Sequence, residues 1–138
     1  MKLLIINGPN LGNIGKREPE IYGHEDFTPF LESLKADFPN VNLSYFQSHH
    51  EGEIVAKLHE ANEQKYDGII LNAGAYSHSS YAIRDAVAAI SVPVVMVHIS
   101  NVYARENFRH ENVIAANCKG VITGFGLKSY KLAVESLL

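Results

Sequence analysis

The four arginines of this chain lie in three polar segments, residues 7–23, 72–85 and 98–109. Each segment begins where a short apolar run stops, whereas the lysines lie mostly elsewhere. The planar guanidinium group binds carboxylate or phosphate through paired hydrogen bonds, and lysine is the commoner solubilising cation of protein surfaces. If the apolar runs are parallel strands, their polar exits share one edge of a sheet. The arginines would then converge on an anionic ligand.

The same segments carry side chains that bind hydroxyl groups or transfer protons. Amides and imidazoles suit substrate hydroxyls, and tyrosine and histidine can carry protons. An unperturbed tyrosine has a pKa of about 10, so a tyrosine base needs a nearby cation that favours tyrosinate. Arg17, five residues before Tyr22, can provide that cation. The predicted site consists of Asn10, Arg17, Tyr22, Asn72, His78, His98, Ser100, Arg105 and Arg109.

A base and an acid on opposite sides of a small anionic polyol suit the removal of a proton next to a carbonyl, followed by loss of water. Three of the side chains also have a purely structural interpretation. Asn72 could close a turn at a strand end, and His78 could cap a helix that starts near residues 79–80. His98 ends an apolar run and could be a core histidine with its hydrogen bonds satisfied. Their coincidence at one sheet edge favours the functional interpretation.

Five short apolar runs are predicted to be strands, with helical periods between them. The strands are expected at residues 3–7, 43–47, 68–72, 92–99 and 120–123. Apolar stripes predict helices over residues 27–38, 54–61, 82–90 and 130–137. The third and fourth strands are continuously apolar, as expected for strands covered on both faces. In the first helix we expect Thr28 as the N-cap and Pro29 at the first helical position.

Strands that alternate with helices predict a parallel sheet. The pattern predicts a single domain over residues 1–138 with the flavodoxin-like three-layer α/β/α fold, a five-stranded parallel sheet and strand order 2-1-3-4-5. Ligands of such sheets bind beyond the carboxyl ends of the strands, where the winding reverses. That place lies between the first and third strands, beside the fourth. The three arginine-bearing segments follow these three strands.

The connection over residues 8–23 is unusually long, since a strand-to-helix connection usually takes about 2 to 6 residues. Its many glycines and prolines exclude a continuous helix. We interpret it as a mobile lid that carries Arg17 and Tyr22 over the site. The alternative is a surface excursion in which these two residues are incidental.

Composition argues against several classes of protein. The single cysteine, Cys118, excludes an intrachain disulfide, and no apolar run reaches the ~18 residues of a membrane span. A net charge of −3 without a basic run argues against a nucleic-acid partner. The apolar run near Met1 is too short for a secretory signal, so we expect a cytoplasmic protein.

Motifs for phosphate, nucleotide and metal binding are incomplete. A phosphate loop would need glycine and a hydroxyl where the chain has Asn10 and Arg17, and no GxGxxG follows the first strand. A phospho-receiver would need aspartates at the strand ends occupied by Asn7 and Asn72. Residues 49–51, His-His-Glu, are adjacent and would rarely face one ion. We therefore expect neither a cofactor nor a metal.

Five long motifs follow one another over nearly the whole chain. They are NGPNLGNIGKREPEIYG at 7–23, FQSHHEGE at 46–53, LNAGAYSHSS at 71–80, IRDA at 83–86 and VHISNVYARENFRH at 97–110. In sequence and order they resemble the type II 3-dehydroquinate dehydratases, or type II dehydroquinases. The resemblance implies anti elimination of water from 3-dehydroquinate to give 3-dehydroshikimate through an enolate, without cofactor or metal. The reaction would serve the shikimate pathway of aromatic amino acid biosynthesis or the breakdown of quinate.

The resemblance also implies roles for individual residues. Tyr22 would be the base that removes the C2 proton, with Arg17 lowering its pKa, and His98 would protonate the departing C1 hydroxyl. Asn10 would hold a water that stabilises the enolate oxygen. Family members are dodecamers, tetramers of trimers, in which Asp85 would reach a neighbouring subunit's site. The remaining implied substrate contacts are hydroxyl contacts from Asn72, His78 and Arg109 and carboxylate contacts from the backbone amides of Ile99 and Ser100.

Three positions depart from the pattern of the family. Met96 replaces an acidic residue that often precedes VHISN, His49 stands where Asn is frequent, and Asn112 where Ser is frequent. Every proposed catalytic position is kept, so we expect activity. Arg105 would organise the lid.

Two other classes of function remain as alternatives. One is a non-catalytic flavodoxin-like module that binds a small anionic metabolite or nucleotide, and the other is a sugar-phosphate isomerase with the same histidine and arginine types. A binding module would not need a tyrosine and an arginine on a sixteen-residue lid. A phosphate enzyme would normally have a glycine-rich loop with hydroxyls.

Overall fold

The computed structural model describes residues 1–12 and 27–138. Their central feature is a sheet with strand order β2-β1-β3-β4-β5, in which every pair of neighbours is parallel. The strands are β1 (Lys2–Asn7), β2 (Asn42–Gln47), β3 (Gly68–Asn72), β4 (Val94–His98) and β5 (Gly120–Thr123). The predicted strand order and flavodoxin-like fold class are confirmed.

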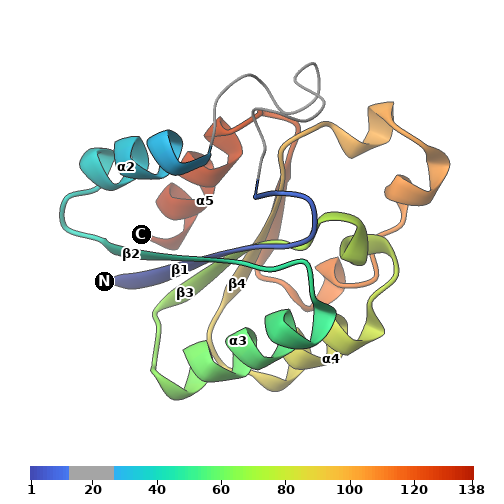
Figure 1. Ribbon diagram of the computed structural model, residues 1–138, viewed down its shortest axis with the longest axis horizontal. Coiled ribbons are helices and arrows are strands. Elements are labelled where there is room, and N and C mark those ends of the chain that lie inside the picture. Colours follow the sequence, from blue (N-terminus) through green and yellow to red (C-terminus); the bar gives the residue numbers. More distant parts are fainter. Residues whose placement is uncertain (13–26) are drawn as a thin grey trace.

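Helices cover both faces of the sheet and make three layers (Figure 1). One face carries α2 (Phe27–Asp37) and α5 (Lys128–Leu137), and the other carries α3 (Glu51–Glu63) and α4 (Tyr81–Ala89). Short 3-10 helices follow the strands: η2 (Gly74–His78), η3 (Val102–Ala104), η4 (Asn107–His110) and η5 (Ala115–Asn117). Each helix in the described ranges is too short or too polar to cross a lipid bilayer.

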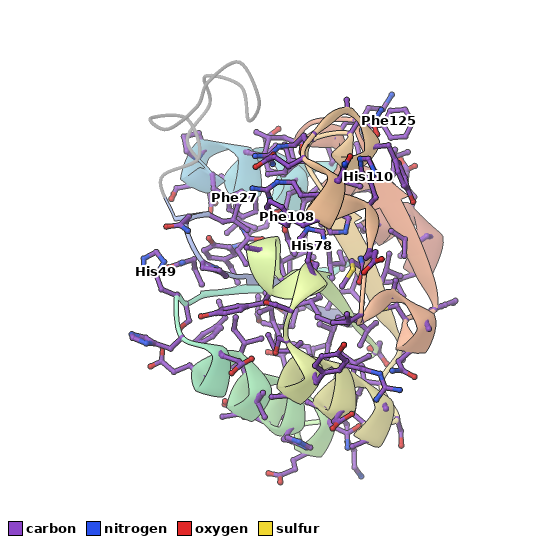
Figure 2. The ribbon with its side chains drawn as sticks, turned by 90° about the vertical axis from the view of Figure 1, so that its right-hand side faces the viewer. Phe27, His49, His78, Phe108, His110 and Phe125 are labelled. Atoms are coloured by element: carbon purple, nitrogen blue, oxygen red, sulfur yellow. The ribbon has the colours of Figure 1, made fainter. Side chains whose placement is uncertain are left out.

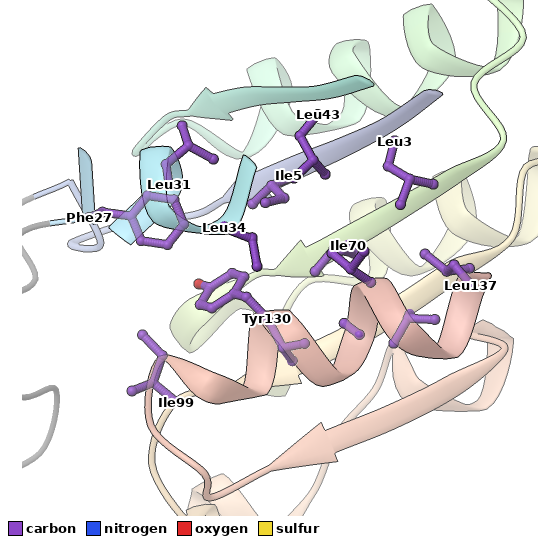
Figure 3. Packing of buried hydrophobic residues seen from close by; sticks show 14 of the residues in the cluster. Leu3, Ile5, Phe27, Leu31, Leu34, Leu43, Ile70, Ile99, Tyr130 and Leu137 are labelled. Carbon is purple, nitrogen blue, oxygen red and sulfur yellow. The ribbon is translucent and has the colours of Figure 1, made fainter. Parts of the chain in front are cut away.

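The hydrophobic core is split by the sheet into two clusters. Leu3 and Ile5 of β1 pack with α2 and α5, whereas Leu4 and Ile6 pack with α3 and α4. The split follows from the strand period, because successive side chains point to opposite faces. All residues of β3 and β4 are buried, as their continuous apolar runs predict. Figure 3 shows the first cluster, with Tyr130 of α5 projecting toward Leu34 of α2.

The start of α2 differs from the prediction. The helix includes Phe27, so Thr28 and Pro29 are its second and third residues and Thr28 is not the N-cap. Phe27 is 2% exposed, and its ring lies 4.8 Å from that of Tyr45 and 5.0 Å from that of Tyr130. Proline is tolerated there because the first N–H groups of a helix have no acceptor within it. Packing of Phe27 between two aromatic rings therefore explains the earlier start.

The fourth strand is shorter than predicted, spanning Val94–His98 rather than residues 92–99. Pro93 has no N–H, and its carbonyl accepts the N–H of Ile69 at 3.0 Å, so the ladder begins around this residue.

The exit of β1 lies directly against the exit of β3. The N–H of Gly8 donates to the carbonyl of Asn72 at 2.7 Å. A Cβ atom at residue 8 would lie 2.8 Å from the carbonyl oxygen of Ala73, so only glycine fits without a shift of backbone. This close approach places the residues after β1 beside those after β3.

Candidate active site

A cavity of about 140 Å³ lies beyond the carboxyl ends of β1, β3 and β4. Its lining comes from residues 9–11, 72–78 and 98–109, which follow these three strands. The position is the switch point between β1 and β3 that the strand order predicts. The cavity brings together eight residues of the sequence prediction: Asn10, Asn72, His78, His98, Ile99, Ser100, Arg105 and Arg109.

Arg17, Tyr22 and most of the predicted lid over residues 8–23 lie outside the described residues. Asp85 is on α4, where its side chain is 71% exposed and pairs with Arg84 at 2.8 Å. A role for Asp85 in its own chain's cavity therefore has no support, and its contact with a neighbouring subunit stays a prediction.

Asn10 has a left-handed backbone with φ of 66°. Asparagine adopts this conformation more readily than most residues, and the N–H of Asn10 donates to His49 Nδ1 at 3.1 Å. His49 thus holds the segment after β1 from the start of α3. In the sequence His49 is visible as part of the rejected metal set at residues 49–51 and as a departure from the family pattern. Its contact with Asn10 is not visible there, because it joins two segments far apart in the chain.

Asn72 closes the turn after β3 and also lines the cavity. Its Oδ1 accepts the N–H of Gly74 at 3.2 Å, which closes the turn after β3. Its Nδ2 donates to the Tyr130 hydroxyl at 2.9 Å, and that hydroxyl donates to Asn7 Oδ1 at 2.7 Å. Tyr130 is fully buried on α5 and orients the Asn72 amide at the cavity wall. From the sequence alone Tyr130 is a core residue of an apolar stripe, and its position there carries no signal of this polar contact.

His78 is held by a backbone carbonyl rather than acting as a helix cap. Its Nδ1 lies 2.6 Å from the carbonyl oxygen of Glu111. A carbonyl only accepts, so Nδ1 carries a proton. The capping interpretation is wrong, because the Ser80 side chain accepts the N–H of Ile83 at the start of α4. Figure 2 shows His78 beside Phe108, whose ring meets the imidazole edge-on at 5.7 Å.

His98 ends β4 and is 7% exposed. Its ring is stacked on that of His78 with 6.3 Å between centroids. Burial, and secondly the positive charge of a protonated His78, lower the pKa of His98 to about 4. His98 is therefore neutral at pH 7, and it is both a buried strand-end residue and part of the cavity wall.

The lowered pKa of His98 predicts a pH-dependent stability. Between pH 6.5 and about 4 the unfolded chain binds one proton that folded His98 does not, so stability falls as the pH is lowered through this window. The full difference corresponds to roughly 3 kcal/mol. Urea unfolding at fixed protein concentration should show this loss in the wild type and a flatter pH dependence in His98→Asn. Parallel curves for the two proteins would contradict the pKa.

Glu106 is an acid in the cavity wall that sequence reasoning missed. Its carboxylate accepts from Arg109 Nε at 3.0 Å and lies 3.7 Å from Arg105 Nε. The hydrogen bond from Arg109 is the first cause that lowers the pKa of Glu106, so the carboxylate stays ionised. Two guanidinium groups and one carboxylate leave a net positive charge. Glu106 and Arg109 are three residues apart in the sequence, and this spacing was the signal that could have indicated their ion pair.

The backbone after β4 presents amide groups. The carbonyl of His98 accepts the N–H of Gly124 at 3.2 Å, and that of Ile99 accepts the N–H of Gly126 at 2.9 Å. In a trans peptide the N–H points away from the carbonyl of the preceding residue. The N–H groups of Ile99 and Ser100 therefore point away from the connection between β5 and α5. Arg105 Nη1 also donates to Ser100 Oγ at 3.4 Å.

Taken together, the described part of the site has neutral and cationic hydrogen-bond donors around a small polar cavity. Such a set suits a small anion that carries hydroxyl groups. Within residues 1–12 and 27–138, no group of three or more His, Cys, Asp and Glu side chains could hold a metal ion.

Comparison with known proteins identifies one family over the full length of the chain. Residues 1–138 match the family described as Dehydroquinase class II. The 3-dehydroquinate dehydratase of Bacillus licheniformis is 56% identical over 135 residues, which cover 96% of this chain and 92% of that protein. That of Bacillus subtilis is 55% identical over 137 residues, which cover 98% of this chain and 92% of that protein.

Solved structures agree with the sequence comparisons. The type II dehydroquinase of Butyrivibrio crossotus superimposes with a TM-score of 0.96 at 46% identity, covering 99% of this chain and 97% of that one. The type II dehydroquinase of Propionibacterium acnes gives a TM-score of 0.93 at 37% identity, covering 99% and 94%. This chain belongs to the class II dehydroquinase family.

Proposed function

We propose that this protein is a 3-dehydroquinate dehydratase, a hydro-lyase that converts 3-dehydroquinate to 3-dehydroshikimate and water. One observation carries the proposal. In a chain of this family, a single cavity is lined by His98, by two arginines and by the segments after β1, β3 and β4, which carry Asn10, Asn72 and the backbone amides of residues 99–100. The substrate is a small anion with several hydroxyl groups, and the cavity wall offers a partner for each kind of group.

The described residues support specific substrate contacts. The N–H groups of Ile99 and Ser100 would take the carboxylate, helped by the positive charge of Arg105. The side chains that would hold the hydroxyl groups are Asn72, His78 and Arg109. Asn10 would hold a water against the forming enolate oxygen. The side chains that would hold the hydroxyl groups are already held by Tyr130, Glu111 and Glu106, respectively. Substrate binding therefore costs little additional side-chain entropy.

The proton transfers balance as an elimination. Tyr22, as phenolate, would take the proton from C2 and leave an enolate, with Arg17 favouring the ionised phenol. His98 would then give a proton to the C1 hydroxyl as the C1–O bond breaks and water leaves. The proton taken up by Tyr22 would return to His98 through solvent, which restores the phenolate and the neutral imidazole. No bound cofactor is needed for these steps.

We also propose a single catalytic domain over residues 1–138 that assembles into a dodecamer of four trimers. Several large aromatic side chains are more than half exposed, which supports burial in subunit contacts: Tyr81, Tyr103, Phe108 and Phe125. Asp85, exposed on α4 near Tyr81, would reach a neighbouring subunit's site. Light scattering measures the assembly state. The cytoplasm is the proposed location, and either aromatic biosynthesis or quinate breakdown would use this chemistry.

The test of the function is direct. Mixing the purified protein with 3-dehydroquinate should raise the ultraviolet absorbance of the conjugated enone of the product. Activity should persist after treatment with a chelator, and after borohydride in the presence of substrate, because no lysine Schiff base is proposed. Binding of 3-dehydroquinate without a rise in absorbance would favour the non-catalytic module. Inactivation by borohydride would overturn the mechanism.

A further inference from the structure

Asn112 contacts His98 without lining the cavity where the substrate is proposed to bind. It follows η4, and its Nδ2 lies 3.2 Å from His98 Nε2 and 2.9 Å from Met96 Sδ. Asn112 and His98 both line a second cavity of about 120 Å³, whereas only His98 also lines the first. Asn112 therefore touches the ring of His98 without lining the space where the substrate is proposed to bind.

The orientation of the Asn112 amide follows from its other partners. Its Oδ1 accepts two backbone N–H groups, that of Ile114 at 3.0 Å and that of Ala115 at 2.9 Å. Backbone N–H groups only donate, so the atom that faces them must be the amide oxygen. A flipped amide would set its NH₂ group against two donors and lose both bonds. The group that faces His98 is therefore a donor.

This orientation determines where His98 carries its proton. Because Asn112 Nδ2 donates, Nε2 of His98 must accept with its lone pair. A neutral imidazole then has its proton on Nδ1, and an imidazolium would direct an N–H of Nε2 at the NH₂ group. We propose that Asn112 is a positioning residue that holds His98 neutral and in the Nδ1-protonated tautomer.

The other neighbours of His98 act in the same direction. Met96 is fully buried, and its thioether is a weak uncharged acceptor for the amide of Asn112. The titratable and charged groups that share the two cavities with His98 in the described structure are His78, Tyr103, Arg105, Glu106, Arg109 and His110. Glu106, the one carboxylate among them, is paired with Arg109. These surroundings oppose a second proton on His98, in line with its lowered pKa.

The consequence deepens the proposed function and rests on it. The proton that His98 offers to the departing hydroxyl comes from Nδ1, the ring nitrogen that does not face Asn112, and Nδ1 regains a proton through solvent after water leaves. Protonation of Nε2 costs the hydrogen bond from Asn112. The contact from Asn112 therefore sets the protonation state of the acid in this enzyme.

The substitution Asn112→Asp tests this with minimal change of shape. One carboxylate oxygen can still accept from Ile114 and Ala115, while the other replaces the donor that faces Nε2. We expect His98 to gain a proton on Nε2 and its pKa to rise by about 1 to 3 pH units, the usual effect of an opposite charge at this distance. The pH dependence of kcat should move in the same direction. Asn117→Asp, which adds the same charge at an exposed position on η5, should leave His98 unchanged.

The readout is solid-state nuclear magnetic resonance of sedimented protein with ¹⁵N-labelled histidine, with the His98 signals assigned from their loss in His98→Asn. The wild type should show protonated Nδ1 and unprotonated Nε2 at pH 7. Met96→Leu should keep this tautomer, because the contact between Asn112 and His98 remains. A proton on Nε2 in the wild type, loss of the tautomer in Met96→Leu, or an unchanged His98 in Asn112→Asp would overturn the proposal.

The resonance readout requires no turnover. Absence of dehydratase activity with the expected tautomer would contradict the proposed function alone, and activity with the other tautomer would contradict this inference alone.

Discussion

Replacement of His98 by asparagine is expected to lower kcat for the dehydration of 3-dehydroquinate by about 10²- to 10⁴-fold, the usual contribution of a general acid. Asparagine keeps a polar group at the end of β4 but cannot transfer a proton. The position is buried against the stacked ring of His78 and the amide of Asn112. The enone absorbance gives kcat and KM for the variant and the wild type.

A matched control separates chemistry from folding. His59→Asn makes the same replacement at an exposed position of α3, away from both cavities, and should leave kcat within about twofold because surface substitutions have small effects. Thermal unfolding and light scattering of both variants would show whether the fold and the assembly are kept. If His98→Asn turned over as fast as His59→Asn, His98 would not be the acid.

Tyr22→Phe is expected to lose most turnover, again by about 10²- to 10⁴-fold, while the affinity for substrate is largely kept. The phenol ionises and the phenyl ring does not, so the variant lacks the base but keeps the bulk of the side chain. A missing base affects the transition state more than the bound ground state. Tyr22 lies outside the described residues, so this expectation rests on the motif at residues 7–23 and on the chemistry.

The measurement pairs initial rates with calorimetric titration of a substrate or product. Tyr66→Phe is the control, because the Tyr66 ring packs under the Lys2 ammonium at 4.2 Å and a phenyl ring can keep this contact. It should change neither constant. Equal losses of affinity and turnover in Tyr22→Phe would identify a structural tyrosine and leave the base to be found elsewhere.

The agreement between prediction and structure is greatest where the signal is local. Apolar runs that alternate with helical periods predict parallel strands. The exits that carry Asn72 and His98 meet at one cavity because parallel strands end on one side of the sheet. The predicted N-cap of α2, Thr28, was wrong because the aromatic contacts of Phe27 with Tyr45 and Tyr130 outweigh the preference for a threonine cap. Those contacts join residues that are distant in the chain.

The sequence by itself determined the layered α/β fold, the strand order, the edge of the sheet where the site lies and most of the chemical groups at it. Period and composition are properties of neighbouring residues, so they can be read without coordinates. Only the tertiary structure decided that Tyr130 orients Asn72, that Glu106 shares the cavity wall with the arginines, and that Asn112 faces His98 with a donor. The direction of a hydrogen bond depends on every partner of both groups, and these partners come from segments that meet only when the chain is folded.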